Sequence, residues 1–178
     1  MRILTVIVLG LSLMLLKPEI ASAQASDTLD IAAANALNIS TIINSDTTTG
    51  GVISNPKRVY RLERGVIYAL DAIITVRGSF KMIATQGSAR PPVLSAKILT
   101  DNSSIARYVQ LYGATSKLEF HDIYFLGIRN DRAISNASNS GISILDSAIS
   151  LKVRRCVFDG YGARAIQVFE GGVWSKID

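Results

Sequence analysis

Two ten-residue segments near the end of the chain repeat one another at a distance of 33 residues. They are LEFHDIYFLG, Leu118–Gly127, and LKVRRCVFDG, Leu151–Gly160. Each copy reads apolar-x-apolar, then two polar residues, then apolar-x-apolar, with a glycine closing the pattern. The positions that agree are Leu118 with Leu151, Phe120 with Val153, Ile123 with Cys156, Phe125 with Phe158, and Gly127 with Gly160.

The alternation inside each copy has a period of two, which predicts β-strands and argues against helical repeats. The two polar residues in each copy are His121-Asp122 and Arg154-Arg155, and neither pair is a residue combination that favours a tight hairpin turn. We therefore expect a gentle corner between two consecutive strands. Repeats a few tens of residues apart are typical of solenoids, in which each copy pairs in parallel with the previous one. The segment ITVRGSFKMIA, from Ile74, is interpreted as an earlier and looser copy.

The repeat also predicts individual contacts. Leu118 should stack on Leu151 and Phe125 on Phe158, with the intervening tyrosines Tyr124 and Tyr161 facing outward. Neighbouring strands lie about 4.8 Å apart, so Asp122 and Arg155 should form an ion pair across the corner. Cys156 takes the inward position of Ile123 and should behave as a small buried hydrophobe.

The segments RLERGVIYALDAIITVRGSFKMIA, LEFHDIYFLGI and LKVRRCVFDGYGARAIQVF resemble the right-handed parallel β-helix proteins of the pectate-lyase-like type. These include exported bacterial polysaccharide lyases and glycoside hydrolases. The resemblance covers Val59 to Asp178. It implies an all-β fold, a right-handed parallel β-helix (solenoid) of about three to four coils in residues 58–178, preceded by an N-terminal cap.

The chain departs from this family at the corner. Many parallel β-helices stack asparagines there, whereas this chain has Asp122 and Arg155. Its last segment, GARAIQVFEGGVWSKID, reads as the beginning of another coil. Because three to four coils are few for this fold, we expect the β-helix to be incomplete at its C-terminus and to associate through the uncapped end.

The first 23 residues read as a secretory signal peptide. Met1-Arg2 supplies the positive start, Ile3–Leu16 is an apolar run, and Ala21-Ser22-Ala23 is a cleavage signature. We therefore expect a secreted, periplasmic or cell-surface protein that has no membrane segment after cleavage. Residues 24–57 are interpreted as an N-terminal cap or linker, with a short helix through DTLDIAAANAL and a strand at NISTII.

Composition narrows the classes of partner. The net charge is +5, from 19 basic and 14 acidic residues, and the charges are scattered, so no nucleic-acid patch is predicted. A mildly positive surface suits an acidic polysaccharide. The single cysteine excludes an intrachain disulfide, so packing must supply the stability of an exported chain. No phosphate loop, zinc-ligand spacing or nucleophile elbow is present.

Four residues are candidates for chemistry: Arg154 and Asp159, which face outward from the second copy, and Arg129 and Asp131, in the polar loop Gly127–Gly141. A lyase needs a base to remove a proton and cations to stabilise the resulting enolate, and arginine presents a planar fork to carboxylates. The structural alternative is that these charges make contacts between strands or lie in a solvated loop.

The lone histidine is expected to be a surface residue. A catalytic histidine needs a carboxylate to orient it, and Asp122, next to His121, faces the opposite way on a strand.

The resemblance implies aspartates as acid and water activator in a glycosidase, or as calcium ligands in a lyase. No cofactor is otherwise evident. The predicted function is an exported carbohydrate-active protein that acts on or binds an acidic polysaccharide, as a lyase or glycoside hydrolase if it is an enzyme. The alternatives are a non-catalytic β-helix module for surface adhesion or polysaccharide binding, or a fragment without independent activity.

Overall fold

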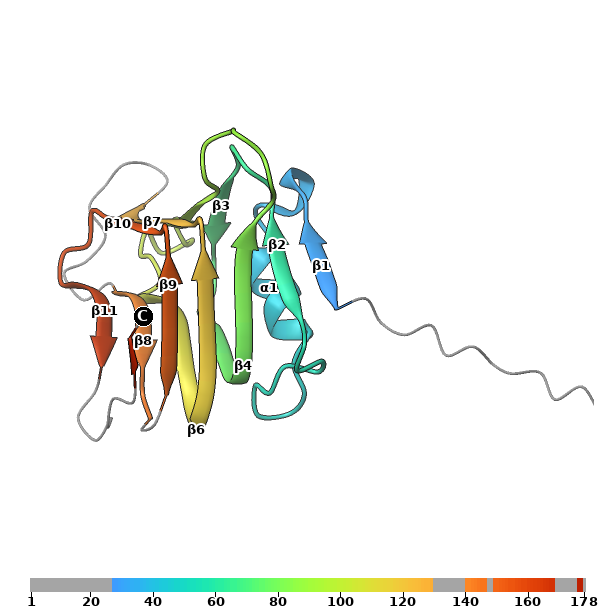
Figure 1. Cartoon of the computed structure of the whole chain (residues 1–178). Coiled ribbons are helices and arrows are strands. Elements are labelled where there is room, and N and C mark those ends of the chain that lie inside the picture. The colour runs from blue at the N-terminus through green and yellow to red at the C-terminus, as the bar shows by residue number, and fades with distance from the viewer. Residues whose placement is uncertain (1–26, 130–139, 147–148, 169–175, 178) are drawn as a thin grey trace, which may run out of the picture.

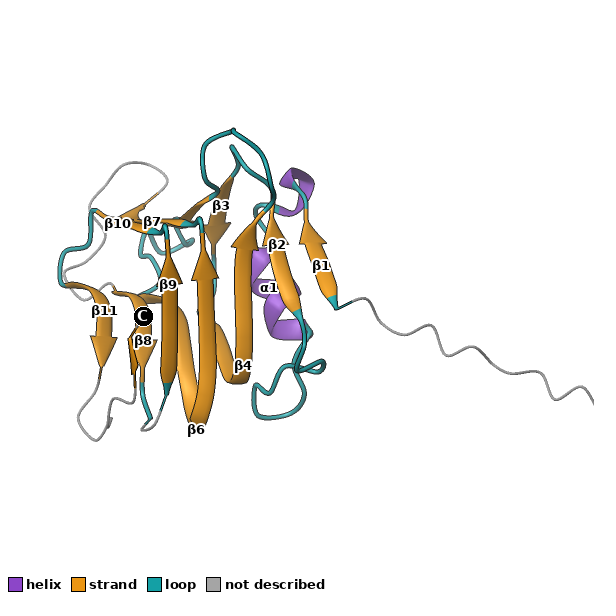
Figure 2. Cartoon of the chain, in the orientation of Figure 1, coloured by secondary structure: helices purple, strands orange, loops and turns teal. Residues whose placement is uncertain are grey.

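The protein is mostly β-strand, and its strands pair in parallel (Figures 1 and 2). The computed structural model describes residues 27–129, 140–146, 149–168 and 176–177. Strands hold 53% of these residues and helices 8%, so the predicted all-β class is confirmed. The signal peptide expected in residues 1–23 lies outside the described residues.

The elements follow one another as short strands after an N-terminal helical segment. In chain order they are β1 (Thr28–Ile31), a 3₁₀-helix (Ala33–Asn35), α1 (Ile39–Ser45), β2 (Val59–Leu62), β3 (Ile67–Leu70), β4 (Ile74–Ala84), β5 (Val93–Ala96), β6 (Arg107–His121), β7 (Tyr124–Arg129), β8 (Ser140–Ile144), β9 (Ser150–Arg154), β10 (Val157–Asp159), β11 (Arg164–Val168) and β12 (Lys176–Ile177).

The strands form two parallel sheets. The larger runs β1-β2-β4-β6-β8-β11, with β9 also beside β6 and β12 beside β9, and the smaller runs β3-β5-β7-β10. The pairing of β4 with β6 breaks after Arg77, where Gly78 has a φ of 87°. The first half of β6 then pairs with β8 and its second half with β9. The larger sheet therefore has two parts, and one cluster of buried side chains joins both parts to the smaller sheet.

The register confirms the 33-residue repeat. Leu118 lies opposite Leu151, and Phe125 opposite Phe158. The rings of Phe125 and Phe158 stack with centroids 4.6 Å apart and planes 6° from parallel. The two repeated segments thus lie in parallel, side by side, in both sheets. Cys156 is half-buried against the core cluster, in the direction predicted for it.

The earlier copy assigned to ITVRGSFKMIA was aligned wrongly. Its second half, Phe80–Met82, pairs with Leu118–Phe120, but its first half pairs with Val109–Tyr112, in the other part of the large sheet. The bend at Gly78 therefore differs from the corner at Asp122. Both bends join two runs of alternating apolar residues, and alternation alone does not distinguish them.

The helix and strand expected near the N-terminus are exchanged. Thr28–Ile31 is a strand because all four of its residues pair with β2. This pairing with a distant strand outweighs the local preference for a helix that begins at Asp27. The NISTII segment is helical. Its isoleucines Ile39, Ile42 and Ile43 follow the i, i+3, i+4 spacing of an amphipathic helix, and Ile39 and Ile43 are fully buried.

Helix α1 provides hydrogen bonds at the start of β4. The side-chain amide of Asn44 donates to the carbonyl of Ile73 at 2.9 Å, and its oxygen accepts from the backbone N–H of Thr75 at 3.1 Å. One side chain therefore satisfies backbone groups that a neighbouring strand would otherwise pair.

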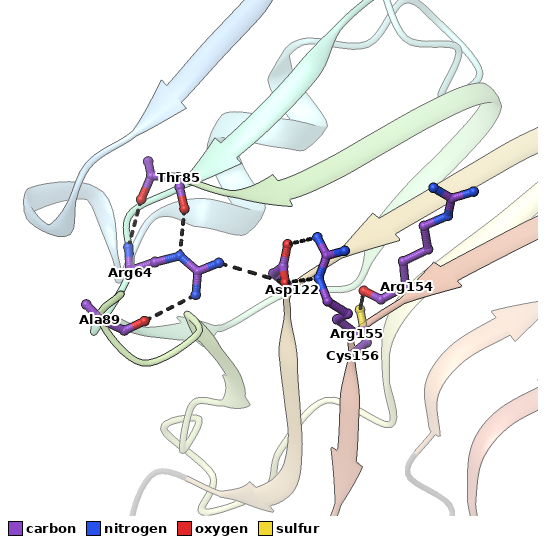
Figure 3. A network of polar contacts seen from close by, with 7 residues as sticks. All are labelled: Arg64, Thr85, Ala89, Asp122, Arg154, Arg155 and Cys156. Carbon is purple, nitrogen blue, oxygen red and sulfur yellow. Dashed lines mark hydrogen bonds and ion pairs between the residues drawn. The ribbon is translucent and has the colours of Figure 1, made fainter. Parts of the chain in front are cut away.

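The corner between the two sheets is stabilised by the predicted ion pair (Figure 3). Arg155 donates through Nε and Nη2 to the two carboxylate oxygens of Asp122, at 2.7 Å each, and Arg64 Nη2 lies 3.8 Å from the same carboxylate. Asp122 and Arg155 have φ values of 59° and 50°, in the left-handed region that few non-glycine residues adopt. The hydrogen bonds from Arg155 hold the pKa of Asp122 below its usual value.

The glycine that closes the first repeat, Gly127, leaves room for an aromatic ring. A Cβ on Gly127 would lie 2.7 Å from the ring of Tyr161 and 2.8 Å from the carbonyl of Gly160. The expectation that Tyr161 faces outward is wrong. Its ring packs on Tyr108, with centroids 5.7 Å apart, because the turn after β10 folds back over Gly127.

A double-mutant cycle tests the corner ion pair. Asp122→Asn and Arg155→Gln should each lower the free energy of unfolding by a small amount, since Arg155 is largely exposed and such pairs are weak. The double variant should lose less than the sum, because the same interaction is removed only once. Urea denaturation measures all four proteins. Strictly additive losses would show that the pair contributes nothing.

Candidate functional site

The outward residues of five neighbouring strands form a charged surface, the β9 face. It consists of β1, β2, the second halves of β4 and β6, and β9 (Figure 1). Inward residues on these strands, such as Met82 and Phe120, are fully buried, so the residues between them face out. Parallel register places the outward residues in rows across the strands. One row is Val59, Lys81, Glu119 and Lys152, and the next is Asp30, Arg61, Ile83, His121 and Arg154.

Glu119 is the centre of the charges on this face. Its carboxylate lies 3.4 Å from Lys81 Nζ, 4.0 Å from Lys152 Nζ and 3.5 Å from His121 Nε2. The side chains of Lys81, Glu119 and Lys152 are 40%, 33% and 31% exposed, so all three remain open to a ligand. Basic residues outnumber acidic ones around this carboxylate, which makes the row attractive to anions.

The surroundings of the histidine favour its neutral form. Burial lowers the pKa of His121, and the positive charges of Lys81, Arg154 and Lys152 act in the same direction against the opposing effect of Glu119. Its Nε2 is enclosed and forms no hydrogen bond to any residue that the structure describes. A base must reach the proton that it removes, so this nitrogen is badly placed for such a role.

A groove of about 250 Å³ crosses the β9 face. It is lined by residues just before and at the start of β2 and by residues of β4 and β6, including Lys57, Lys81, Lys117 and Glu119. The groove therefore runs across the strands, along the rows. Three of these four side chains are cationic, which suits an anionic ligand lying across the sheet.

A second hollow, of about 500 Å³, continues from the first, since both are lined by Pro56 and Ser79. Small residues such as Gly78 and Ala114 dominate its wall, and Arg77 is its charged member. The two hollows are therefore neighbours on the surface.

The four candidate residues from the sequence do not form one site. Arg154 is exposed on the β9 face, in the same row as His121. Asp159 lies on the smaller sheet, where it accepts a 2.6 Å hydrogen bond from the hydroxyl of Tyr124. Arg129 is the last residue of β7. Its side chain and the whole of Asp131 lie outside the described part of the structure.

Sequence reasoning missed the groove residues Lys81, Lys117 and Glu119. It also missed Lys152, which lies beside Glu119 on the next strand. The signal was present in the repeat: Glu119 and Lys152 are matched outward positions 33 residues apart. Glu119 also lies two residues before His121, on the same side of the strand, and takes the place next to the histidine for which Asp122 was considered.

Neither the comparison with known proteins nor the common types of functional site indicates what this chain does. No protein-family model, curated protein or solved structure matches this chain. Within the described ranges, three or more His, Cys, Asp and Glu side chains nowhere gather as a metal site requires, and calcium stays a prediction. None of the described helices is long and apolar enough to cross a membrane.

The burial of His121 predicts a pH dependence of stability. Its pKa is lowered in the folded protein, so as pH falls below about 6.5 the unfolded chain takes up the proton first and the free energy of unfolding decreases. The loss is at most about 1.4 kcal/mol per pH unit. Urea denaturation at about pH 7.5 and about pH 5.5 should show a smaller loss for His121→Gln than for the unmodified protein. Equal losses in the two proteins would contradict this assignment.

Proposed function

We propose that this protein is an exported right-handed parallel β-helix whose β9 face binds an anionic polysaccharide. Three features support the β-helix: the parallel pairing in two sheets, the matched 33-residue register, and the corner at which Asp122 and Arg155 both have a positive φ. The signal-like character of residues 1–23 supports export.

The cationic groove is the observation that carries the functional part. It is open, it crosses three strands, and Lys57, Lys81 and Lys117 project into it. An extended polymer can lie along such a groove and meet one row position per strand, at intervals of about 4.8 Å. Carboxylate or sulfate groups on a sugar chain would then pair with the lysines that line the groove.

Binding without cleavage fits the described residues better than catalysis. The enclosed Nε2 of His121 is badly placed to remove a proton from a substrate. Hydrolysis by paired carboxylates requires two acids about 5 to 10 Å apart across the sugar. In the groove lining, Glu119 is the acidic member.

Removing groove charges tests the proposal. Lys81→Gln combined with Lys117→Gln should weaken binding to unsulfated chondroitin, alginate or polygalacturonate by at least about fivefold, because two cationic contacts are lost. Isothermal titration at low salt measures the affinity. The matched control is Arg90→Gln with Lys97→Gln, which removes the same charge at the ends of the β5 segment and should bind as the unmodified protein does.

Three results would overturn the proposal. The first is equal weakening in the groove and control variants, which would indicate attraction by net charge alone. The second is rising ultraviolet absorbance on incubation with these polymers, which would reveal an unsaturated product and make the protein a lyase. Failure of the unmodified protein to bind any of the three polymers would exclude the groove as a polysaccharide site.

A further inference from the structure

The row that contains Glu119 has a pattern of charge that a simple polyanion does not match. Lys81, Glu119 and Lys152 come from three successive strands, β4, β6 and β9. The order across the face is therefore positive, negative, positive, and the two lysines are two strand spacings apart, roughly 10 Å. All three side chains are accessible to a ligand.

A sugar unit advances a glycan chain by roughly the spacing of neighbouring strands. A chain lying across the strands would thus place successive sugars over Lys81, Glu119 and Lys152. A polymer with a carboxylate on every sugar would bring one against Glu119, and two like charges at contact distance repel. A polymer with a carboxylate on every second sugar would place its charges on the two lysines.

The neutral sugar of such a polymer would also satisfy Glu119. Hydroxyl and amide N–H groups are donors, and an ionised carboxylate is an acceptor with room for several hydrogen bonds. The contacts that Glu119 now makes with the two lysines are long, at 3.4 and 4.0 Å, so a ligand can replace them without breaking short hydrogen bonds.

We propose that Glu119 makes the β9 face selective for glycans that carry an anionic group on alternate sugars. This inference rests on the proposed polysaccharide-binding function and names the ligand class of the same β9 face. Lys81 and Glu119 line the groove on that face, and Lys152 continues their row on the next strand. Glu119 acts as a specificity-determining residue, since it repels a second anionic group while Lys81 and Lys152 attract the first and the third. Such rejection by an unfavourable contact is a common route to specificity.

The test compares two polymers of equal length on the full chain. Unsulfated chondroitin alternates a uronate with an N-acetylated neutral sugar, and polygalacturonate carries a carboxylate on every sugar. The unmodified protein should bind the chondroitin more tightly by isothermal titration. Glu119→Gln should tighten binding of polygalacturonate by about fivefold to tenfold and change that of chondroitin little, so that the preference disappears.

Two further variants separate selectivity from folding and net charge. Glu119→Asp keeps the negative charge and should keep the preference, whereas loss of preference in this variant would overturn the inference. Asp159→Asn changes the net charge by the same amount as Glu119→Gln, but on the other sheet, and should leave the preference intact. A thermal melt of each variant confirms that it is folded.

The remaining outcomes are decisive in different ways. Equal affinity of the unmodified protein for both polymers, or equal tightening of both by Glu119→Gln, would overturn the selectivity and leave the polysaccharide-binding groove standing. Binding of neither polymer would overturn this inference, and failure to bind alginate as well would overturn the proposed function with it.

Discussion

The in-register parallel pairing of β6 with β9 determines both surfaces of the large sheet at once. Side chains alternate along a strand, so aligning Leu118 with Leu151 in the core also aligns Glu119 with Lys152 on the outside. A slip of one residue would turn the charged row inward and the apolar residues outward, which the buried core forbids. The charge pattern of the groove is therefore a direct consequence of the packing of the core.

The corner after β6 maintains this register as the chain passes to the smaller sheet. Asp122 and Arg155 both adopt left-handed backbone conformations, and their bidentate ion pair joins two corners that lie next to each other. The stacked rings of Phe125 and Phe158 continue the same alignment beyond the corner. One repeat length thus positions the core, the corner and the outward charges together.

The sequence was most informative where the repeat is regular and least where it is not. The pair Asp122–Arg155 followed from one offset, because both copies have the same corner. Lys81 lies 38 residues before Glu119, so no fixed offset connects it to the groove, and its place required the register of β4 with β6. The NISTII segment is rich in β-branched residues, which favour strands, but the spacing of its isoleucines is helical and the packing of Ile39 and Ile43 decides for the helix. The separation of Arg154 from Asp159 depends on the corner between them, which sends them to different sheets.

The most direct measurement is disulfide formation between matched outward positions. In a Cys156→Ser background, Glu119→Cys with Lys152→Cys places two thiols on neighbouring strands in register, about 5 Å apart at Cα, within the range of a disulfide. Mild oxidation followed by mass spectrometry should find this bond in most molecules. Glu119→Cys with Ser150→Cys is two residues out of register, at roughly 8 Å, and should remain reduced. Closure of the second pair in place of the first would contradict the register on which the core and the groove both depend.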